Sequence, residues 1–440
     1  MLSRITVTNP PSLALSDADI LLRRYNAIRR QTVLLTEPLA IEDFQLQSML
    51  DASPPKWHLA HTTWFFETFV LEPHAPWYQL FHPAYKFLFN SYYNSVGERH
   101  SRSERGLLTR PHVQDVLHYR QHVDQAIHRL MVEAGESERL SLGQLLELGL
   151  QHEQQHQELL ITDLKHGFSR NPLFPQYCKQ APSPGVTPRS VHLEWVRFSG
   201  GLVEIGHAGP SFAFDNEHPR HRVYLQPFAL ASRLTTGGEF LQFIDDRGYE
   251  RPELWLSDGW ATRTAQQWQA PLYWHHDGAD WQIYTLAGLR PLEPTEPVTH
   301  LSFYEADAFA RWAGARLPTE FEWEHAAAGY DPTHGHFADD GGFHPVAAIA
   351  TEREADASPR LMQLFGDCWE WTASAYLGYP GYRPAEGALG EYNGKFMCNQ
   401  MVLRGGSCAS PRGHLRATYR NFFPPEARWQ FSGIRLARDL

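Results

Sequence analysis

Apolar residues recur at three- and four-residue spacing through the first third of the chain, which is the period of an amphipathic helix. Four helices are therefore predicted, over residues 20–28, 57–65, 113–132 and 141–166. Ser16-Asp17 offers an N-cap for the first helix, and Ser141 with Gln144 three residues later has capping-box spacing for the fourth. Four helices of these lengths suggest a bundle, in which inward-facing side chains could build a site.

The pattern changes after a proline-rich stretch, residues 171–190, which we interpret as a linker. Beyond it, short β-like runs at 194–206 and 221–230 alternate with glycine turns, and a helix is expected over 302–313. The sequence thus predicts an α+β protein of two domains. The helical domain covers residues 1–170 and the mixed domain covers residues 191–440.

A long polar and aromatic segment, residues 81–113, joins the second and third predicted helices. A connection of this length inside a compact domain is usually functional or disordered, and its aromatic residues favour order. We therefore expect this segment to contribute to a site.

Composition narrows the class of protein. Hydrophobic residues make up 42% and charged residues 20% of the chain, as in a soluble globular protein, and the net charge of −11 argues against nucleic-acid or anionic-membrane partners. No apolar run is long enough to span a bilayer, and the start lacks the apolar core of a secretory signal, so we expect a cytoplasmic protein. Four cysteines without CxxC spacing are expected to be reduced, buried thiols.

The sharpest motif is HEQQHQELL, which starts at His152. Residues on a helix are ~100° apart, so His152 and His156 lie within ~40° of each other and can bind one metal. One interpretation is a zinc peptidase of HExxH type, with Glu153 as general base. Another is a three-histidine site with open positions, completed from a different helix, as in non-haem iron enzymes. Surface histidines on a polar helix are the alternative without a metal.

A third ligand is available in PPKWHLAHTTWFFE on the second predicted helix. His61 sits among apolar neighbours there, where an unpaired imidazole would be costly. A hydrogen-bonded core histidine is the structural alternative for this residue. His58, one turn earlier, competes for the same role.

Together these residues resemble a known family. WHLAH followed by HEQQHQE is similar to the DinB-like four-helix bundle of ergothioneine-pathway sulfoxide synthases, iron(II) enzymes that join a thiol to the imidazole of hercynine (trimethylhistidine) using oxygen. The second half, with FDNEHPRHRV, LFGDCWEWTAS, LRGGS and FSGIRLARD, resembles the formylglycine-generating-enzyme fold, a C-type-lectin-like fold. The implied substrates are hercynine, O2 and a cysteine-type thiol. The product would be the sulfoxide at the imidazole C2.

Two departures separate the chain from neighbouring families. Formylglycine generators need two copper-binding cysteines shortly after RGGS, and Ser410 and Leu415 stand at those places here. Ovothiol-pathway relatives usually carry a further methyltransferase domain, for which we expect no room before Leu440. A selenium-transferring relative that uses a selenosugar remains an alternative within the enzyme class. A lectin-like binding module without metal remains one outside it.

The resemblance assigns roles to the metal and hercynine residues. It implies that His61, His152 and His156 bind Fe(II), and that Gln155 and Asn421 hold the hercynine carboxylate.

The aromatic stretch 418–431 matches the family's substrate-binding segment. Phe422 would lie near the trimethylammonium, where a ring face attracts a quaternary cation, and Phe423 follows it. Packing of both rings in the lectin-domain core is the alternative.

The 81–113 segment supplies the thiol clamp and the proton donor. Arg102 and Arg105 resemble the arginine pair that holds the thiol substrate's carboxylate, with Arg99 and Arg110 as rivals.

A phenol near the metal could protonate reduced oxygen and favour carbon–sulfur bond formation over oxidation of sulfur alone. Tyr92 and Tyr93 are the candidates for this catalytic role. The C-terminal alternatives are Tyr376, Tyr379 and Tyr382.

The identity of the thiol substrate is predicted from two positions at which this chain differs from its relatives. Relatives that use γ-glutamylcysteine carry an aspartate and an arginine where this chain has Phe423 and Ala427. A phenyl ring and a methyl group cannot pair with an ammonium and a carboxylate. Free cysteine is therefore the expected co-substrate, unless Arg428, one residue off register, compensates.

Overall fold

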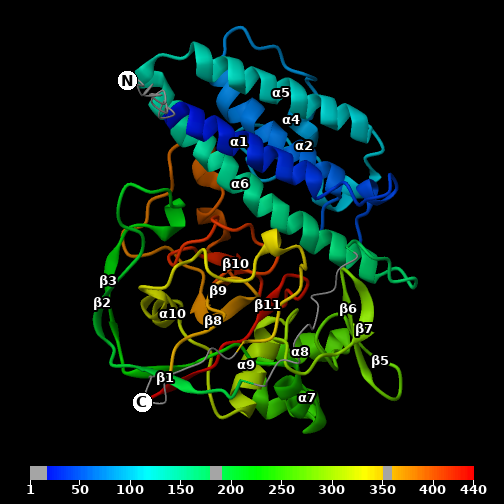
Figure 1. The fold of residues 1–440 in the computed structure, drawn as a ribbon, viewed down its shortest axis with the longest axis vertical. Coiled ribbons are helices and arrows are strands. Elements are labelled where there is room, and N and C mark those ends of the chain that lie inside the picture. The colour runs from blue at the N-terminus through cyan, green and yellow to red at the C-terminus, as the bar shows by residue number, and fades with distance from the viewer. Residues whose placement is uncertain (1–16, 179–190, 350–358) are drawn as a thin grey trace, which may run out of the picture.

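The computed structural model describes residues 17–178, 191–349 and 359–440. A helical region at the N-terminal end packs against a region of mixed helices and short strands, with helix α6 running along the boundary (Figure 1). The long helices are α1 (Asp17–Leu34), α2 (Pro55–Phe66), α5 (Val113–Glu133) and α6 (Glu136–Ser169). Short helical turns between them are η1 (Asp43–Gln45), η2 (Glu67–Leu71), α3 (Glu72–His74), α4 (Tyr85–Leu88) and η3 (Arg102–Leu107).

The four predicted helices are confirmed, but the predicted start of the fourth is wrong. Helix α6 begins at Glu136, and Ser141 lies inside it, where its hydroxyl donates to the Glu138 carbonyl instead of capping the helix. Glu136 and Glu138 occupy the first turn, where negative charge stabilises a helix N-terminus. The other predicted cap, at Ser16, lies outside the described residues.

Short strands form four small sheets in the second half. Among the described residues their orders are β1-β4-β12, β10-β9-β8-β11, β2-β3 and β5-β6-β7, and of these strand pairs only β11 with β8 is parallel. The strands are β1 (Trp195–Phe198), β2 (Gly201–Ile205), β3 (His221–Leu225), β4 (Phe228–Ala231), β5 (Trp274–His276), β6 (Trp281–Thr285), β7 (Gly288–Pro291), β8 (Trp369–Ala375), β9 (Met401–Arg404), β10 (Asn421–Phe423), β11 (Ser432–Gly433) and β12 (Ala437–Asp439).

The helices of this half are short, and three of them begin with a capping box. They are α7 (Gly237–Asp245), α8 (Ser257–Gln266), α9 (Phe303–Trp312) and α10 (Glu320–Ala327), with turns η4 (Asp215–Glu217), η5 (Gly248–Glu250), η6 (Pro252–Leu254), η7 (Ala338–Asp340), η8 (Ala388–Glu391) and η9 (Gly394–Phe396). Ser302 and Glu305 form a capping box at the start of α9, which confirms the helix expected over 302–313. The β-like runs predicted at 194–206 and 221–230 are β1 to β4.

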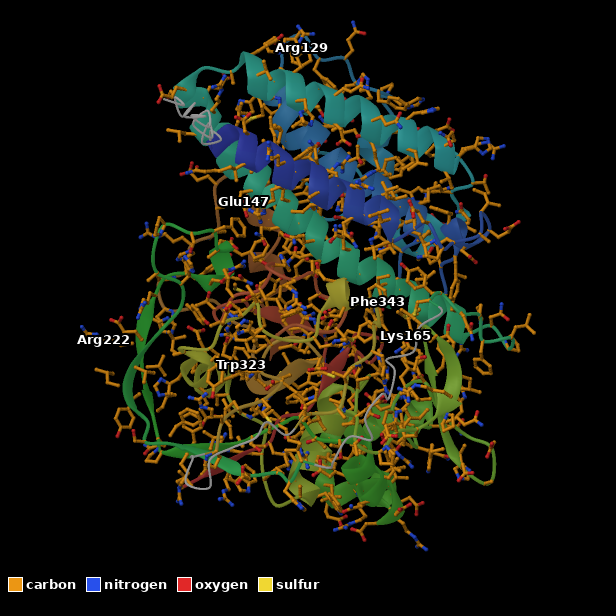
Figure 2. All side chains as sticks on the ribbon, in the orientation of Figure 1. Arg129, Glu147, Lys165, Arg222, Trp323 and Phe343 are labelled. Atoms are coloured by element: carbon orange, nitrogen blue, oxygen red, sulfur yellow. The ribbon has the colours of Figure 1, made fainter. Side chains whose placement is uncertain are left out.

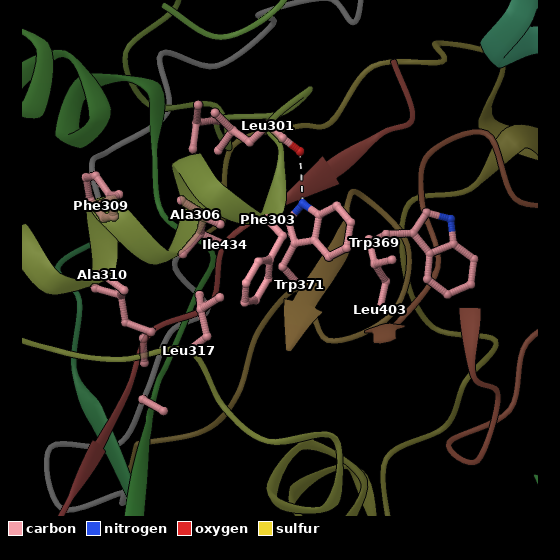
Figure 3. Packing of buried hydrophobic residues seen from close by; sticks show 14 of the residues in the cluster. Leu301, Phe303, Ala306, Phe309, Ala310, Leu317, Trp369, Trp371, Leu403 and Ile434 are labelled. Carbon is pink, nitrogen blue, oxygen red and sulfur yellow. Dashed lines mark hydrogen bonds between the residues drawn. The ribbon is translucent and has the colours of Figure 1, made fainter. Parts of the chain in front are cut away.

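The aromatic core of the second half holds these thin sheets together. Trp371 of β8 is fully buried, and its indole nitrogen donates to the Leu301 carbonyl at 2.9 Å (Figure 3). Phe303 of α9 and Leu403 of β9 pack around it (Figure 3). Because the indole donor finds a carbonyl, the ring is buried without an unpaired polar atom.

Helix α6 is shared by both halves. Its side chains Leu160, Ile161 and Leu164 form one buried cluster with Tyr273 and Phe431 of the second half. Lys165, labelled on α6 in Figure 2, reaches across the same boundary to within 2.7 Å of the His300 ring. The helix that carries HEQQH is therefore packed against the second half.

The expectation that the cysteines are reduced, buried thiols is confirmed in part. The four cysteines are thiols rather than disulfides, and Cys368 and Cys408 are buried. Cys178 is half-buried and Cys398 is exposed, so the expectation of burial is wrong for Cys398, which precedes β9 in an open loop. None of the helices within the described ranges is long and apolar enough to cross a membrane.

One ionic cluster touches all four long helices. The buried carboxylate of Glu153 on α6 accepts from Arg29 and Thr32 of α1 at 2.9 and 2.6 Å, and from Arg120 of α5 at 2.7 Å. Both guanidinium groups also donate to the Thr63 hydroxyl of α2. These contacts lower the pKa of Glu153 to about 2 against the opposing effect of burial.

The cluster predicts a large loss of stability for Glu153→Gln. The substitution keeps the side-chain shape but leaves two buried arginines without their shared anion, which costs about 3–5 kcal/mol. Chemical denaturation should show that loss, whereas Glu138→Gln, an exposed change that loses only a charge at the N-terminus of the same helix, should stay within about 1 kcal/mol of the parent. Equal stability of the two variants would contradict the role given to Glu153.

Candidate metal centre and active-site cavity

Three histidines meet where α2 packs against α6. His61 comes from α2, and His152 and His156 come from successive turns of α6. One ring nitrogen from each lies within 4.8 Å of the others. The helical spacing places His152 and His156 side by side, and the packing of α2 against α6 adds His61.

Neighbouring groups orient two of the three rings. The Nδ1 of His61 lies 2.6 Å from the Phe89 carbonyl, which can only accept, so its Nε2 keeps a lone pair. Asp163 lies 3.2 Å from the Nε2 of His58, and the Nδ1 of His58 lies 2.9 Å from the Nδ1 of His156. Because Asp163 can only accept, the Nε2 of His58 carries the proton and its Nδ1 has a lone pair. That Nδ1 then accepts from the Nδ1 of His156, so the Nε2 of His156 keeps a lone pair for a metal. His58 therefore lies behind the cluster rather than in it.

The electrostatics favour neutral, ligating imidazoles. Burial, followed by the neighbouring rings, lowers the pKa of His61 and of His156 well below the usual range, and burial lowers that of His152 to about 4. The Nε2 atoms of His61 and His152 are 3.3 Å apart, and the Nδ1 of His152 has no hydrogen-bond partner among the described residues. Three neutral imidazole nitrogens form a donor set that suits iron, zinc or copper and leaves positions open for substrates.

The zinc-peptidase interpretation does not fit this geometry. A general base must reach the metal-bound water, and the Glu153 carboxylate points instead into the ionic cluster with Arg29 and Arg120. Its depressed pKa, about 2, also makes it a poor base. In the HExxH pattern of this chain, His152 and His156 are therefore candidate metal ligands, whereas Glu153 has a structural role.

A cavity of about 500 Å³ lies between α6 and the second half. Gln155 borders it from α6, and Tyr92 and Arg102 border it from the 81–113 segment. All three candidate residues of β10 line it too, namely Asn421, Phe422 and Phe423. A second cavity, of about 1040 Å³, is bordered by His152, Gln155 and Tyr93. The structure thus brings most of the predicted substrate residues to two spaces that share Gln155.

The two predicted arginines have different surroundings. Arg102 donates to the Tyr92 hydroxyl at 3.0 Å. Arg105 is buried, and its guanidinium lies 3.4 Å from the centre of the Trp57 ring, which stacks on His61. It donates to the Ser53 hydroxyl, its Nε has no partner in the described part of the chain, and burial lowers its pKa to about 9. A buried guanidinium without a described carboxylate partner is well suited to an anionic ligand.

The tyrosine candidates also differ in burial and in their contacts. Tyr92 is half-buried against Phe396, whereas Tyr93 is buried against Trp64 and burial raises its pKa. The C-terminal alternatives are engaged in contacts within the second half: Tyr376 with Asn216, Tyr379 with Arg404 and Tyr382 with Asp215.

On β10 the predicted residues have local partners. The Asn421 side-chain oxygen accepts from the Phe422 amide, and the Phe422 ring stacks on Tyr376 at 4.1 Å. Phe423 packs edge-on against Trp429.

Sequence reasoning missed Tyr419, Trp369 and Glu158, which all line the smaller cavity. Gln155 donates to the Tyr419 hydroxyl at 2.7 Å, and the Tyr419 ring lies against Trp369. Glu158 follows Gln155 by one helical turn, so the helix phase alone could have indicated that the two face the same side. Only the fold brings Tyr419 to them.

The sequence of the second half places the chain in a class of proteins. Residues 181–440 match the sulfatase-modifying factor enzyme 1-like domain family. The formylglycine-generating enzyme of Streptomyces coelicolor is 30% identical and aligns over 59% of this chain and 93% of that relative.

Two relatives extend the similarity into the helical half. The hercynine oxygenase of Mycolicibacterium thermoresistibile is 32% identical over 94% of this chain and 93% of that protein. The hercynine oxygenase of Mycolicibacterium smegmatis is 34% identical over 67% of this chain and 71% of that protein. The chain belongs to the hercynine oxygenase family, as its motifs indicated.

The Gln155–Tyr419 bond should contribute to stability across the boundary. In Tyr419→Phe the Gln155 amide loses its acceptor, and we expect the unfolding free energy to fall by about 1–3 kcal/mol. Tyr224→Phe, on an exposed ring of β3, is the matched control and should be close to neutral. If both variants unfold at the parent's denaturant midpoint, Tyr419 does not anchor Gln155.

Proposed function

We propose that the chain is an iron(II)- and oxygen-dependent sulfoxide synthase that joins the sulfur of cysteine to the imidazole C2 of hercynine. The observation that carries the proposal is the cluster of three neutral imidazoles, of which His152 borders one of two cavities that share Gln155 and are lined by most of the predicted substrate residues. Membership of the hercynine oxygenase family supports the choice of substrate. In this proposal residues 1–170 are a DinB-like bundle, 171–190 a linker and 191–440 the lectin-type domain.

Iron(II), held by His61, His152 and His156, would supply a centre at which the imidazole, the thiolate and oxygen react. The protein's own groups then have to bind and orient the two organic substrates. Amide side chains of Gln155 on α6 and Asn421 on β10 can donate to the hercynine carboxylate, and the Phe422 ring face suits a trimethylammonium group. Orientation of this kind brings the imidazole C2 and the sulfur within reach of each other.

The thiol substrate would enter from the side of the 81–113 segment. Arg102 lines the cavity, and Arg105 lies behind it against Trp57, which stacks on His61. An amino-acid carboxylate held by these guanidiniums would keep the cysteine side chain near the histidine cluster. A phenol of Tyr92 or Tyr93 would supply the proton that favours bond formation to carbon.

The first experiment measures the metal. After anaerobic loading, the parent should bind one iron(II) per chain, and His61→Ala, His152→Ala and His156→Ala should each lose most of it because two imidazoles hold iron(II) weakly. His58→Ala is the matched control, since the hydrogen bond of His58 to the ligand candidates goes to the Nδ1 of His156 and leaves the Nε2 of His156 untouched. It should still load iron, with affinity lowered by about 10–100-fold.

Full iron occupancy in His61→Ala would contradict the ligand set. Oxygen-consumption assays on the loaded parent with hercynine and a panel of thiols and selenosugars then test the reaction. The expected product is the sulfoxide of the hercynine–cysteine conjugate, identified by mass spectrometry.

Removing the hydroxyl of Tyr92 or Tyr93 is expected to change the reaction product rather than substrate binding. Tyr92→Phe or Tyr93→Phe should leave both substrates bound but shift oxygen use towards thiol dioxygenation, which yields sulfinic acid. The ratio of sulfoxide to sulfinate is the measurement. An unchanged ratio in both variants would place the proton donor elsewhere, and Tyr379→Phe and Tyr382→Phe would be measured next.

The residues of the cavity wall support cysteine as the thiol substrate. Phe423 and Ala427 line the cavity and offer no partner for the charged ends of a γ-glutamyl group. Arg428 also borders it, but its guanidinium pairs with the buried Glu305 at 2.8 Å and lies over Trp268. Freeing Arg428 for a substrate would leave Glu305 without this ion-pair partner, and such a loss is costly.

We therefore expect cysteine to be preferred over γ-glutamylcysteine in a direct competition measured as kcat/KM. Arg102→Leu combined with Arg105→Leu should abolish most cysteine use by raising KM. A clear preference for the dipeptide, or unaltered cysteine use in the double variant, would contradict the assignment.

A further inference from the structure

A chain of hydrogen bonds runs along the side of α6 that meets the second half. Helix α6 contributes Glu147 (labelled in Figure 2), Gln151 and Gln155, which are four residues apart and therefore lie along one stripe. His414 and Tyr419 of the second half lie between Gln151 and Gln155 in this chain. Gln155 borders both cavities, and Glu147 borders the larger one. The chain thus connects a predicted substrate residue to a distant carboxylate.

The contacts of the chain are short, and its central members are buried. The Gln151 amide nitrogen donates to Glu147 at 2.7 Å, and the Gln151 oxygen lies 2.6 Å from the Nδ1 of His414. The Nε2 of His414 lies 3.3 Å from the Tyr419 hydroxyl, to which the Gln155 amide nitrogen donates at 2.7 Å. Gln151, His414 and Tyr419 are each at most 5% exposed, so these bonds are shielded from water.

The carboxylate end sets the direction of the hydrogen bonds. Glu147 forms an ion pair with Arg24, and a carboxylate only accepts, so the nitrogen of Gln151 faces it and the oxygen of Gln151 faces His414. Burial, followed by the charges of Arg416 and Arg24, lowers the pKa of His414 well below its usual range, so the ring is neutral. Because the Gln151 oxygen can only accept, the single ring proton is on the Nδ1 of His414, and the Nε2 keeps a lone pair.

The same direction continues to the cavity. The Tyr419 hydroxyl donates its proton to the Nε2 of His414 and accepts from the Gln155 nitrogen. Reversing the Gln155 amide would place its oxygen against the Tyr419 oxygen, whose proton points to His414, and two acceptors would face each other. The Gln155 amide is therefore held in one orientation, which leaves its second N–H and its carbonyl oxygen for a ligand.

We propose that His414 is a positioning residue that acts through Tyr419 on Gln155, and that Glu147 sets the orientation of the Gln155 amide. The inference rests on the proposed function and deepens it, since Gln155 is proposed there to donate to the hercynine carboxylate. A glutamine side chain loses rotamer freedom when it binds a ligand, and a side chain that is already fixed avoids most of that cost. The chain therefore strengthens the contact with the carboxylate, although His414 does not touch the substrate.

The test measures how much the substrate carboxylate contributes to binding. Equilibrium dissociation constants are measured for hercynine and for its decarboxylated analogue, in which hydrogen replaces the carboxylate. The proteins are the parent, His414→Phe and His218→Phe, each loaded with the same metal without oxygen. His218 borders the larger cavity, but its ring packs against His207 instead of the chain, so it is the matched control.

The preference for hercynine over the analogue should fall by about 3–10-fold in His414→Phe, because the ligand itself must then order Gln155. In the oxygen-consumption assay the KM for hercynine should rise, whereas the KM for cysteine should stay within about twofold of the parent's, a split that a general loss of stability does not produce. His218→Phe should keep the parent's preference. An unchanged preference in His414→Phe, or an equal fall in both variants, would overturn the inference.

A double variant tests whether the effect passes through Gln155. In Gln155→Leu the positioned amide is absent, so the addition of His414→Phe should lower the preference for hercynine no further. Additive losses would overturn the inference, because His414 would then act on the substrate by another route.

The other end of the chain gives a milder variant for the case in which His414→Phe does not fold, as judged by its melting curve. Glu147→Gln keeps the side-chain shape, but an amide both donates and accepts, so the direction of the chain is no longer fixed. A fall in the preference for hercynine of at least about twofold is expected, and the parent's preference in this variant would overturn the inference. Glu136→Gln changes another carboxylate that borders the larger cavity and is the matched control.

The two levels of the proposal fail in different ways. A parent that binds no hercynine would overturn the proposed function itself. Tight binding of hercynine by the parent, with the same preference over the analogue in every chain variant, would overturn only the positioning role of His414 and Glu147.

Discussion

The buried ion cluster centred on Glu153 is the constraint on which the rest of the site depends. It joins Arg29 of α1 and Arg120 of α5 to α6, and Thr63 of α2 receives hydrogen bonds from both arginines. A buried carboxylate with two guanidinium partners tolerates little displacement, because any movement leaves charge unpaired. The rotation of α6 about its own axis is thereby determined.

That rotation decides what each neighbouring residue of HEQQHQE faces. Successive residues of a helix point ~100° apart, so with Glu153 directed into the bundle, His152 and His156 face α2. Gln155 and Glu158 then face the second half, where Tyr419 and the RGGS segment meet them. A single helix thus presents three chemically different faces.

The boundary between the two halves keeps the cavity in place. Apolar side chains of α6 pack with those of the second half in one cluster, and Gln155, Glu158 and Lys165 each make a polar contact across it. The cavity is therefore lined by residues from both ends of the chain, for example Tyr92 and Phe422. Each half alone would expose the donor groups that the other half satisfies, so the site requires both.

Several features were predictable because they depend on local periodicity. Helical spacing identified the four long helices and the pair His152 and His156, and an imidazole in an apolar helix indicated His61. The start of α6 was missed because Ser141 with Gln144 imitates a capping box, whereas the acidic first turn at Glu136 has no equally distinctive spacing. Capping signals are weak compared with the packing of a long helix.

Local periodicity could not predict the role of residues whose partners lie far away in the sequence. The sequence by itself determined which residues can ligate a metal, which helices carry them and which family the chain resembles, because these follow from spacing and side-chain chemistry. Only the tertiary structure decided that Glu153 is structural, that His58 lies behind His156, and that Glu158 reaches Ser410. Each of these depends on which groups meet after long loops close, and the energy of a buried charge is set by those partners rather than by its neighbours in the chain.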